Sequence, residues 1–222
     1  MAIWLKGSLA EPLQPARDGL VSGIFMDATT MRDLAGQAGL PVAEVLSRLA
    51  DMYDLPQHVQ LFGPDYRALM KEAERLARLL DAFQPLLPLT AAGLAACARL
   101  NEQGFQVAIT GIAHPGQVLL AVEAGAATLI PEPVFYAAAT PGAVSERQYL
   151  RDYLDRQGRP AELMCKALFA ADLPPRLSLG FDGLILSPTT WKLLAQDPAT
   201  DVFIRQLDQS YQAIGGGDWL NT

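Results

Sequence analysis

The segment Gln84–Leu100, QPLLPLTAAGLAACARL, reads as a buried strand that leads directly into a helix. Its apolar run ends at Pro88, Thr90 occupies a position typical of a helix N-cap, and alanine and leucine then recur at helical spacing. In barrels built from strand–helix units, catalytic groups lie at the carboxyl ends of the strands. This strand ends in apolar residues around Leu86, so the chemistry is expected from other strands.

The same pattern repeats along the chain. Further strands are predicted near residues 2–6, 23–27, 58–62, 106–110, 128–131, 163–167 and 183–187, in addition to 83–89. Amphipathic helical stretches lie between them, and Gly104, Gly125 and Gly180 fall where helix C-caps belong. Eight strands alternating with helices predict an α/β fold, a (β/α)8 barrel forming one domain over residues 1–222. A doubly wound open sheet is the alternative, but no G-x-G-x-x-G turn supports it.

The composition limits the classes of partner. The chain has 222 residues and is 50% hydrophobic, which suits a large core. A net charge of -7 and a pI near 4.8 argue against nucleic acid or an anionic membrane. No apolar stretch approaches the roughly 20 residues of a membrane span, and no signal peptide is indicated. The two cysteines suit a reducing compartment, so a cytoplasmic protein is expected.

Polar residues near the ends of predicted strands form the candidate catalytic set: Lys6, Asp27, His58, Thr110, Glu132 and Lys166. No metal or other cofactor is expected, because the two histidines are widely separated and no H-x-H or H-E-x-x-H spacing occurs. A metal site built from Asp27, His58 and Glu132 is the weaker alternative. A serine-hydrolase triad is also disfavoured, since no G-x-S-x-G segment is present.

Lys6 and Lys166 each interrupt an apolar strand at its end. A lysine in that position must pair with a carboxylate or reach the open mouth of the barrel. One interpretation is a structural ion pair with Asp27 or Glu132. The other is an amine that attacks a carbonyl to form a Schiff base, with the charge of the second lysine lowering the pKa of the first.

Three segments carry a resemblance to a known family: LPLTAAGLAACARLNEQG (87–104), TGIAHPGQVLLAVEAGAATLIP (110–131) and DPATDVFIRQLDQSYQAIGGG (197–217). On these segments the chain resembles the small transaldolases and fructose-6-phosphate aldolase. The resemblance covers nearly the whole length. It implies a (β/α)8 class I enzyme that works through a lysine Schiff base, without a cofactor, on a small carbonyl compound.

The resemblance also indicates that the family's usual catalytic set is replaced here. Leu86 stands where the family motif V-K-V-P-V-T has its Schiff-base lysine. Lys6 replaces an aspartate of strand one, Asp27 an asparagine after strand two, His58 a glutamine of strand three and Glu132 a tyrosine of strand six. Lys166 falls at a small-residue position that lines the active site in this family.

The substrate pocket is expected to be lined by Leu86, Phe135, Tyr136, Ala167 and Phe25. Phe135 and Ala167 correspond to the family's phosphate-binding arginine and serine. Neither side chain can bind a phosphate dianion, so an unphosphorylated carbonyl substrate is expected.

These replacements predict a rewired class I site for carbon–carbon bond formation or cleavage, with Lys166 as nucleophile and Lys6 as its electrostatic partner. Glu132 or Asp27 would transfer protons, and His58 or Thr110 would orient water or a substrate hydroxyl. Two alternatives stay open: a Glu132-dependent condensation of an aldehyde with an amine in specialised biosynthesis, and a non-catalytic scaffold. Lysines fully neutralised by the two acids would favour the scaffold.

The C-terminal segment, residues 201–222, contains a helix that a (β/α)8 barrel does not need for closure. The resemblance implies that this segment packs on a neighbouring subunit of a homo-oligomer, a pentamer or a decamer. A helix that covers the base of its own barrel is the alternative.

Overall fold

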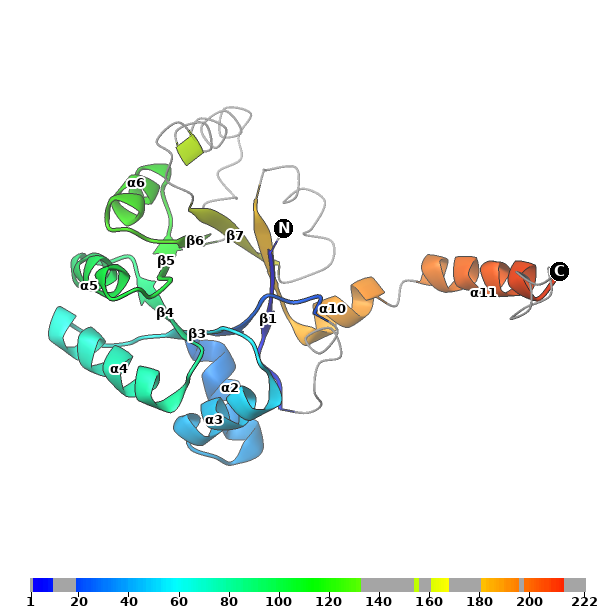
Figure 1. The fold of residues 1–222 in the computed structure, drawn as a ribbon, viewed down its shortest axis with the longest axis horizontal. Coiled ribbons are helices and arrows are strands. Elements are labelled where there is room, and N and C mark those ends of the chain that lie inside the picture. Colours follow the sequence, from blue (N-terminus) through cyan, green and yellow to red (C-terminus); the bar gives the residue numbers. More distant parts are fainter. Residues whose placement is uncertain are drawn as a thin grey trace.

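The computed structural model describes residues 2–9, 19–132, 154–155, 161–167, 181–195 and 198–213. Eight parallel strands form a closed barrel in chain order, with β8 returning to pair with β1 (Figure 1). They are β1 (Ala2–Lys6), β2 (Gly23–Met26), β3 (Gln57–Gln60), β4 (Phe83–Pro88), β5 (Ala108–Ile112), β6 (Thr128–Pro131), β7 (Glu162–Ala167) and β8 (Gly183–Leu186). The predicted (β/α)8 barrel is therefore confirmed.

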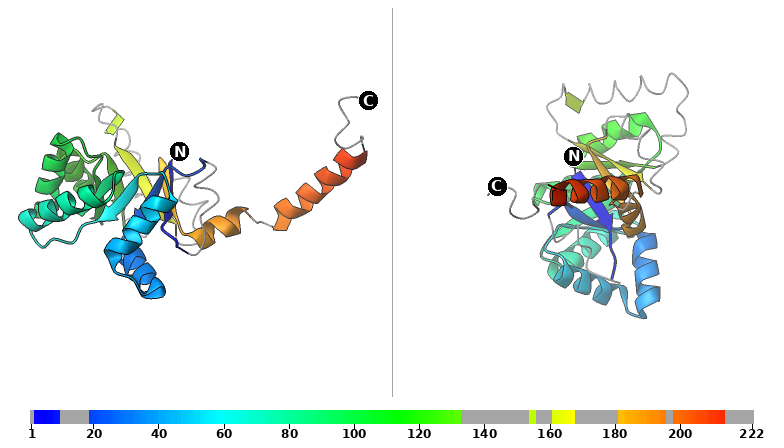
Figure 2. Two further views of the ribbon diagram at one scale, coloured as in Figure 1. Left: turned by 60° about the horizontal axis from the view of Figure 1, so that its bottom comes forward. Right: turned by 90° about the vertical axis from the view of Figure 1, so that its right-hand side faces the viewer.

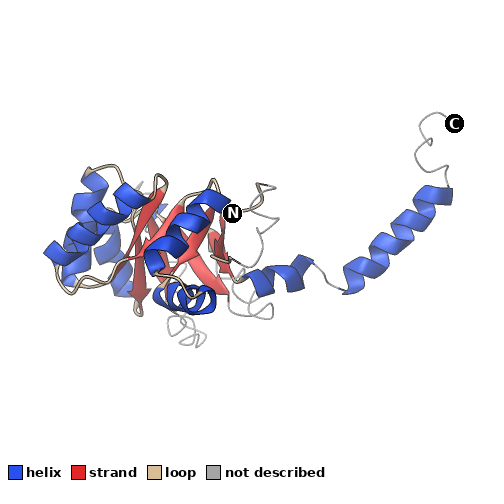
Figure 3. Cartoon of the chain, turned by 90° about the horizontal axis from the view of Figure 1, so that it is seen from below, coloured by secondary structure: helices blue, strands red, loops and turns tan. Residues whose placement is uncertain are grey.

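Helices lie outside the strands (Figure 3). They are α2 (Ala28–Ala38), α3 (Val42–Met52), α4 (Tyr66–Leu79), α5 (Ala91–Glu102), α6 (Pro115–Glu123), α10 (Pro188–Ala195) and α11 (Pro198–Ala213). Thr90 caps α5 as predicted, because its Oγ1 accepts a hydrogen bond of 3.0 Å from Gly93 N. Gly104 and Gly125 follow helices with φ of 89° and 82°, values that favour glycine. Gly180 lies outside the described residues.

Inward and outward side chains form two separate cores. The outward side chains of the strands pack against the helices in one large cluster that includes Ile24, Leu87 and Leu129. The inward side chains form a second cluster inside the barrel: Trp4, Phe25, Leu86, Ala108, Ile130, Met164 and Ile185. Every strand except β3 contributes one residue to this inner cluster, so the barrel is filled rather than hollow.

Two strands depart from their predicted bounds by two residues, and the others by one at most. The sequence predicts a strand at 58–62, but the ladder ends earlier because the Glu72 carboxylate accepts hydrogen bonds of 2.7 Å and 3.1 Å from Phe62 N and Gly63 N. The strand predicted at 106–110 begins at Ala108, since the N–H of Gln106 bonds instead to the Gln84 side chain. Both departures come from side chains that capture backbone donors.

The last helix, α11, extends away from the barrel (Figures 1 and 2). Its large apolar side chains are about half exposed: Val202 47%, Phe203 57%, Ile204 48% and Leu207 48%. The alternative in which this helix covers the base of its own barrel is therefore wrong. Residues 214–222 of the C-terminal segment lie outside the described residues.

The junction between β4 and α5 depends on a close approach of two backbone segments. A Cβ atom added at Gly93 would collide with the carbonyl oxygen of Pro88. The first turn of α5 can therefore sit against the end of β4 only because residue 93 has no side chain.

We predict that Gly93→Ala lowers the free energy of unfolding by about 1–3 kcal/mol, the usual cost of overpacking. Gly36→Ala is the matched control, since Gly36 also lies in a helix but a Cβ there meets nothing within 4 Å. That variant should gain roughly 1 kcal/mol from helix propensity. Urea denaturation of both variants measures the difference, and equal stabilities would contradict the role assigned to the junction.

Candidate active site

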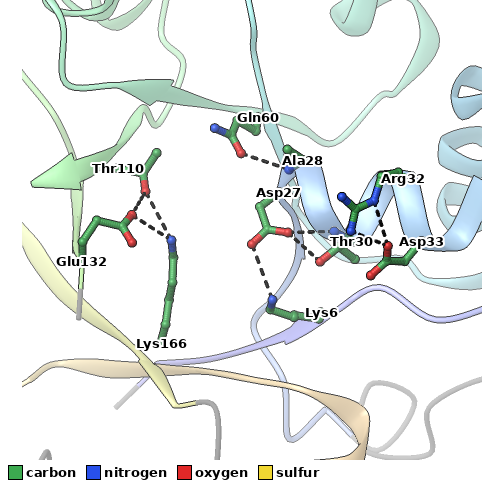
Figure 4. A network of polar contacts seen from close by, with 10 residues as sticks. All are labelled: Lys6, Asp27, Ala28, Thr30, Arg32, Asp33, Gln60, Thr110, Glu132 and Lys166. Atoms are coloured by element: carbon green, nitrogen blue, oxygen red, sulfur yellow. Dashed lines mark hydrogen bonds and ion pairs between the residues drawn. The ribbon is translucent and has the colours of Figure 1, made fainter. Parts of the chain in front are cut away.

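The carboxyl ends of the strands meet at one opening of the barrel, here called the mouth. The last inward residues there are Lys6 on β1, Asp27 after β2, Gln60 on β3, Pro88 on β4, Thr110 on β5, Glu132 after β6, Lys166 on β7 and Ser187 after β8. Five of the six residues in the predicted catalytic set are thus brought together (Figure 4). The exception is His58.

Lys166, Glu132 and Thr110 form one hydrogen-bonded cluster across β5, β6 and β7. The Lys166 Nζ lies 3.0 Å from Glu132 Oε1 and 3.5 Å from Thr110 Oγ1. The Thr110 hydroxyl lies 3.1 Å from the same Glu132 oxygen. The side chains of Lys166 and Glu132 are 15% and 34% exposed, so the ion pair is sheltered while its carboxylate remains accessible from the mouth.

Lys6 and Asp27 form a second, longer ion pair. The Lys6 Nζ lies 3.5 Å from Asp27 Oδ2. The other oxygen of this carboxylate, Oδ1, accepts hydrogen bonds from Thr30 N at 2.9 Å and from Thr30 Oγ1 at 2.7 Å. Asp27 is therefore the N-cap of α2 as well as the partner of Lys6.

The environment holds Asp27 in its charged form. Burial by itself raises the pKa of this carboxyl, but the two hydrogen bonds from Thr30 and the charges of Lys6 and Lys166 outweigh burial and leave the pKa below its usual value. Both lysine charges act on the same carboxylate. Asp27 is consequently poorly suited to carry a proton near neutral pH.

Both lysines are thus in ion pairs with the acids that the sequence suggested as partners. The two lysines and the two carboxylates give this part of the mouth a formal net charge of zero. The two ion pairs are not equivalent. Lys166 and Glu132 are in short contact, and both contact the Thr110 hydroxyl. In the longer pair, the Asp27 carboxylate is held mainly by its hydrogen bonds from Thr30 at the start of α2.

The floor of the mouth is apolar. Leu86, which the resemblance is expected to align with the lysine of the family motif, is fully buried in the inner cluster together with Phe25. The Lys166 Nζ lies 5.9 Å from the centroid of the Phe25 ring, within the range of a cation–π contact. These two expected pocket residues therefore lie beneath the polar groups.

His58 is not at the mouth, and the expectation that placed it there is wrong. It occupies the β3 position of the inner layer, where its ring stacks on Trp4 with centroids 3.6 Å apart. Burial lowers its pKa to about 3, so the imidazole is neutral at physiological pH. Its Nδ1 has no hydrogen-bond partner among the described residues.

Gln60 is the mouth residue that the sequence analysis missed. Its Oε1 accepts a hydrogen bond of 3.0 Å from Ala28 N, at the start of α2. Strict alternation along β3 would have found it once the strand was known to end at residue 60.

The remaining expected pocket residues are not placed at the mouth. The Ala167 side chain packs in the outer cluster, because it is adjacent to the inward-facing Lys166 on β7. Phe135 and Tyr136 lie outside the described residues.

Neither a metal-binding cluster nor a membrane-spanning helix is found in the part of the chain that the structure describes. No group of at least three histidine, cysteine, aspartate or glutamate side chains in that part of the chain is arranged to hold a metal ion. No helix within the described ranges is long and apolar enough to cross a membrane.

We predict that buried, neutral His58 makes the fold sensitive to acid. Because unfolding restores its ordinary pKa of 6.5, stability present above pH 6.5 is lost as the pH falls towards about 3. Between pH 7 and pH 5 this residue should account for a loss of about 2 kcal/mol in the free energy of unfolding. In His58→Phe, which keeps an aromatic ring beside Trp4, the free energy of unfolding should fall by about 2 kcal/mol less between pH 7 and pH 5 than in the wild-type protein. Urea denaturation at both pH values measures the difference. Equal losses in the two proteins would refute this linkage.

Comparison with known proteins agrees with the resemblance seen in the sequence. The family model Transaldolase/Fructose-6-phosphate aldolase matches residues 26–139. A probable transaldolase of Rhizobium meliloti (strain 1021) is 30% identical over 82% of this chain and 83% of its own. One from Caulobacter sp. (strain K31) is 26% identical over 90% of this chain and 91% of its own.

A solved structure supports the architecture. A crystal structure from Burkholderia cenocepacia J2315, described as a phosphonomutase, superposes with a TM-score of 0.61 over 93% of this chain and 92% of its own, at 14% identity. At that identity the likeness concerns the fold alone. From the family match and the relatives together, the chain belongs to the transaldolase/fructose-6-phosphate aldolase family.

Proposed function

We propose that the protein is a class I lyase or transferase that forms or cleaves carbon–carbon bonds of an unphosphorylated carbonyl compound through a Schiff base on Lys166. The observation that carries this proposal is the 3.0 Å contact between Lys166 Nζ and Glu132 Oε1 at the barrel mouth. It supplies an amine and a proton acceptor in direct contact, above an apolar floor.

The chemistry requires a neutral amine, because an ammonium group has no lone pair with which to attack. Glu132 accepts a proton from Lys166, and the amine nitrogen then forms a bond to the carbonyl carbon while one of the two protons left on that nitrogen passes to the carbonyl oxygen. The resulting carbinolamine loses that oxygen as water when Glu132 returns its proton, which leaves an iminium ion. The iminium accepts the electron pair of the carbon–carbon bond that breaks, and donates it again when a bond forms.

The other mouth residues have supporting roles. Thr110 contacts both Lys166 and Glu132, so it can hold the carboxylate in line with the amine or orient water. Lys6 adds a positive charge to the same mouth. Asp27 is assigned to holding Lys6 and α2 in place, because its pKa keeps it ionised.

The two ion pairs also bear on the alternatives. Neutralised lysines were the condition that favours a non-catalytic scaffold, and both lysines are paired. A scaffold, however, gives no reason for the 34% exposure of Glu132 or for its contact with a second polar group, Thr110. The same exposed carboxylate supports a second candidate function, an acid–base condensation of an aldehyde with an amine in which Glu132 is essential.

Trapping distinguishes these functions. Cyanoborohydride with a panel of unphosphorylated aldehydes and ketones should leave a stable adduct on the peptide that contains Lys166, as measured by mass spectrometry. Lys166→Met should abolish the adduct, and Glu132→Gln should slow its formation by roughly 100-fold, as expected for loss of a general acid–base group. Lys71→Met is the matched control, because Lys71 is exposed on α4 and should leave trapping unchanged.

Turnover without an adduct would exclude the Schiff base and favour acid–base catalysis by Glu132. Neither turnover nor an adduct with any substrate would favour the scaffold.

We also propose that the protein is a cytoplasmic homo-oligomer, a pentamer or a decamer, assembled through α11. Four large apolar side chains of α11 are about half exposed, and the helix extends away from its own barrel (Figure 2). Apolar surface of this kind is normally covered by a partner.

Deletion of residues 201–222 should therefore lower the mass measured by multi-angle light scattering. The double variant Phe203→Ser and Leu207→Ser should act in the same direction, because it removes apolar surface without shortening the chain. Asp208→Ser, on the same exposed helix, is the control and should leave the mass unchanged. A monomeric full-length protein would contradict the proposal.

A further inference from the structure

We infer that Lys6 binds the carboxylate group of the substrate, so that the site takes oxo carboxylic acids. This inference rests on the proposed function, since it assigns the carbonyl end of the same molecule to Lys166. It concerns the β1 side of the mouth, where the proposed Schiff-base chemistry gives Lys6 only a supporting charge.

The first argument is that Lys6 has unused hydrogen-bonding capacity. An ammonium group has three donors, and among the described residues the only acceptor for Lys6 Nζ is Asp27 Oδ2, at 3.5 Å. That carboxylate is engaged more tightly by Thr30, at 2.9 Å and 2.7 Å. A substrate anion can therefore bind Lys6 without disrupting a short ion pair.

The second argument is the difference in exposure between the two lysines. Each follows a residue of the inner cluster by two positions, Lys6 after Trp4 and Lys166 after Met164, so both lie one inward position above that cluster. The Lys6 side chain is 23% exposed and the Lys166 side chain 15%. A molecule that spans them would place its carbonyl at the more sheltered lysine and its charged end at the more exposed one.

The third argument is the separation of the two groups. The strands β7 and β1 are separated only by β8, which corresponds to about 10 Å between their backbones. Lysine side chains can close most of such a gap. The charges of both lysines act on Asp27, in agreement with two ammonium groups that share one mouth. The span suits a small molecule with a few carbons between its two functional groups.

Charge decides between a carboxylate and a phosphate. Lys6 brings a single positive charge, and Asp27 beside it is anionic. Together with Lys6 and Asp27, a bound carboxylate gives a net charge of −1, whereas a phosphate dianion gives −2 and is repelled more strongly by Asp27. The predicted preference is therefore for a carboxylate.

The test compares levulinate (4-oxopentanoate) with its methyl ester in cyanoborohydride trapping. The two probes carry the same ketone and differ in the charge at the far end. The wild-type protein should trap levulinate roughly tenfold faster than the ester, the ratio expected for one hydrogen bond to a charged group. The ratio should approach one in Lys6→Met and persist in Lys6→Arg. Because both rates are measured on the same protein, any effect of Lys6 on the Lys166 amine cancels.

A ratio near one in the wild type, or an unchanged ratio in Lys6→Met, would overturn the inference while the Schiff base stands. If no adduct forms with either probe, the proposed function has failed, and binding of pentanoate, which has no ketone, decides the inference separately. Saturable binding by isothermal titration calorimetry that is lost in Lys6→Met would support the carboxylate site. Absence of binding to the wild type would refute it.

Discussion

Closure of the parallel sheet, completed where β8 pairs with β1, is the constraint on which the rest of the molecule depends. Closure gives every strand an inside and an outside, and the two-residue period of a strand then assigns each side chain to one of them. Lys166 faces the mouth and Ala167 the helices for this reason alone. The same constraint places Lys6, Glu132 and Thr110, which are far apart in the sequence, around one opening.

The amino groups at the mouth come from β1 and β7, whereas Leu86 on β4 is buried in the inner apolar cluster. The resemblance to the family motif leads us to expect the lysine of that motif at the position of Leu86. This exchange is physically reasonable, because an apolar residue in the middle layer completes the packing with Phe25 and Met164. The ion pair of Lys166 and Glu132 then lies on a filled apolar layer, which excludes water from its lower side.

The fold could be predicted from the sequence because apolar periodicity, Thr90 as a cap and glycines after helices all agree along the chain. The site was harder to predict, since it depends on where each strand ends. Glu72 captures Phe62 N and Gly63 N from a helix further along the chain, and no local pattern reveals this. That early end puts Gln60 at the mouth and leaves His58 in the inner layer beside Trp4. For Lys6 and Lys166, the sequence left two interpretations open, a structural ion pair and a Schiff-base amine. It could not decide between them because residues far apart in the sequence do not reveal which side chains meet.

Asp27 links the mouth to the order of a helix. Its carboxylate holds the first turn of α2 through Thr30 and the ammonium group of Lys6 at the same time. Whatever draws Lys6 away leaves the carboxylate wholly to the helix, and whatever loosens that turn frees the carboxylate for Lys6. A bound molecule that moved Lys6 would therefore change the charge beside the carboxylate that caps α2, and hydrogen exchange of the first amides of α2 would report that change.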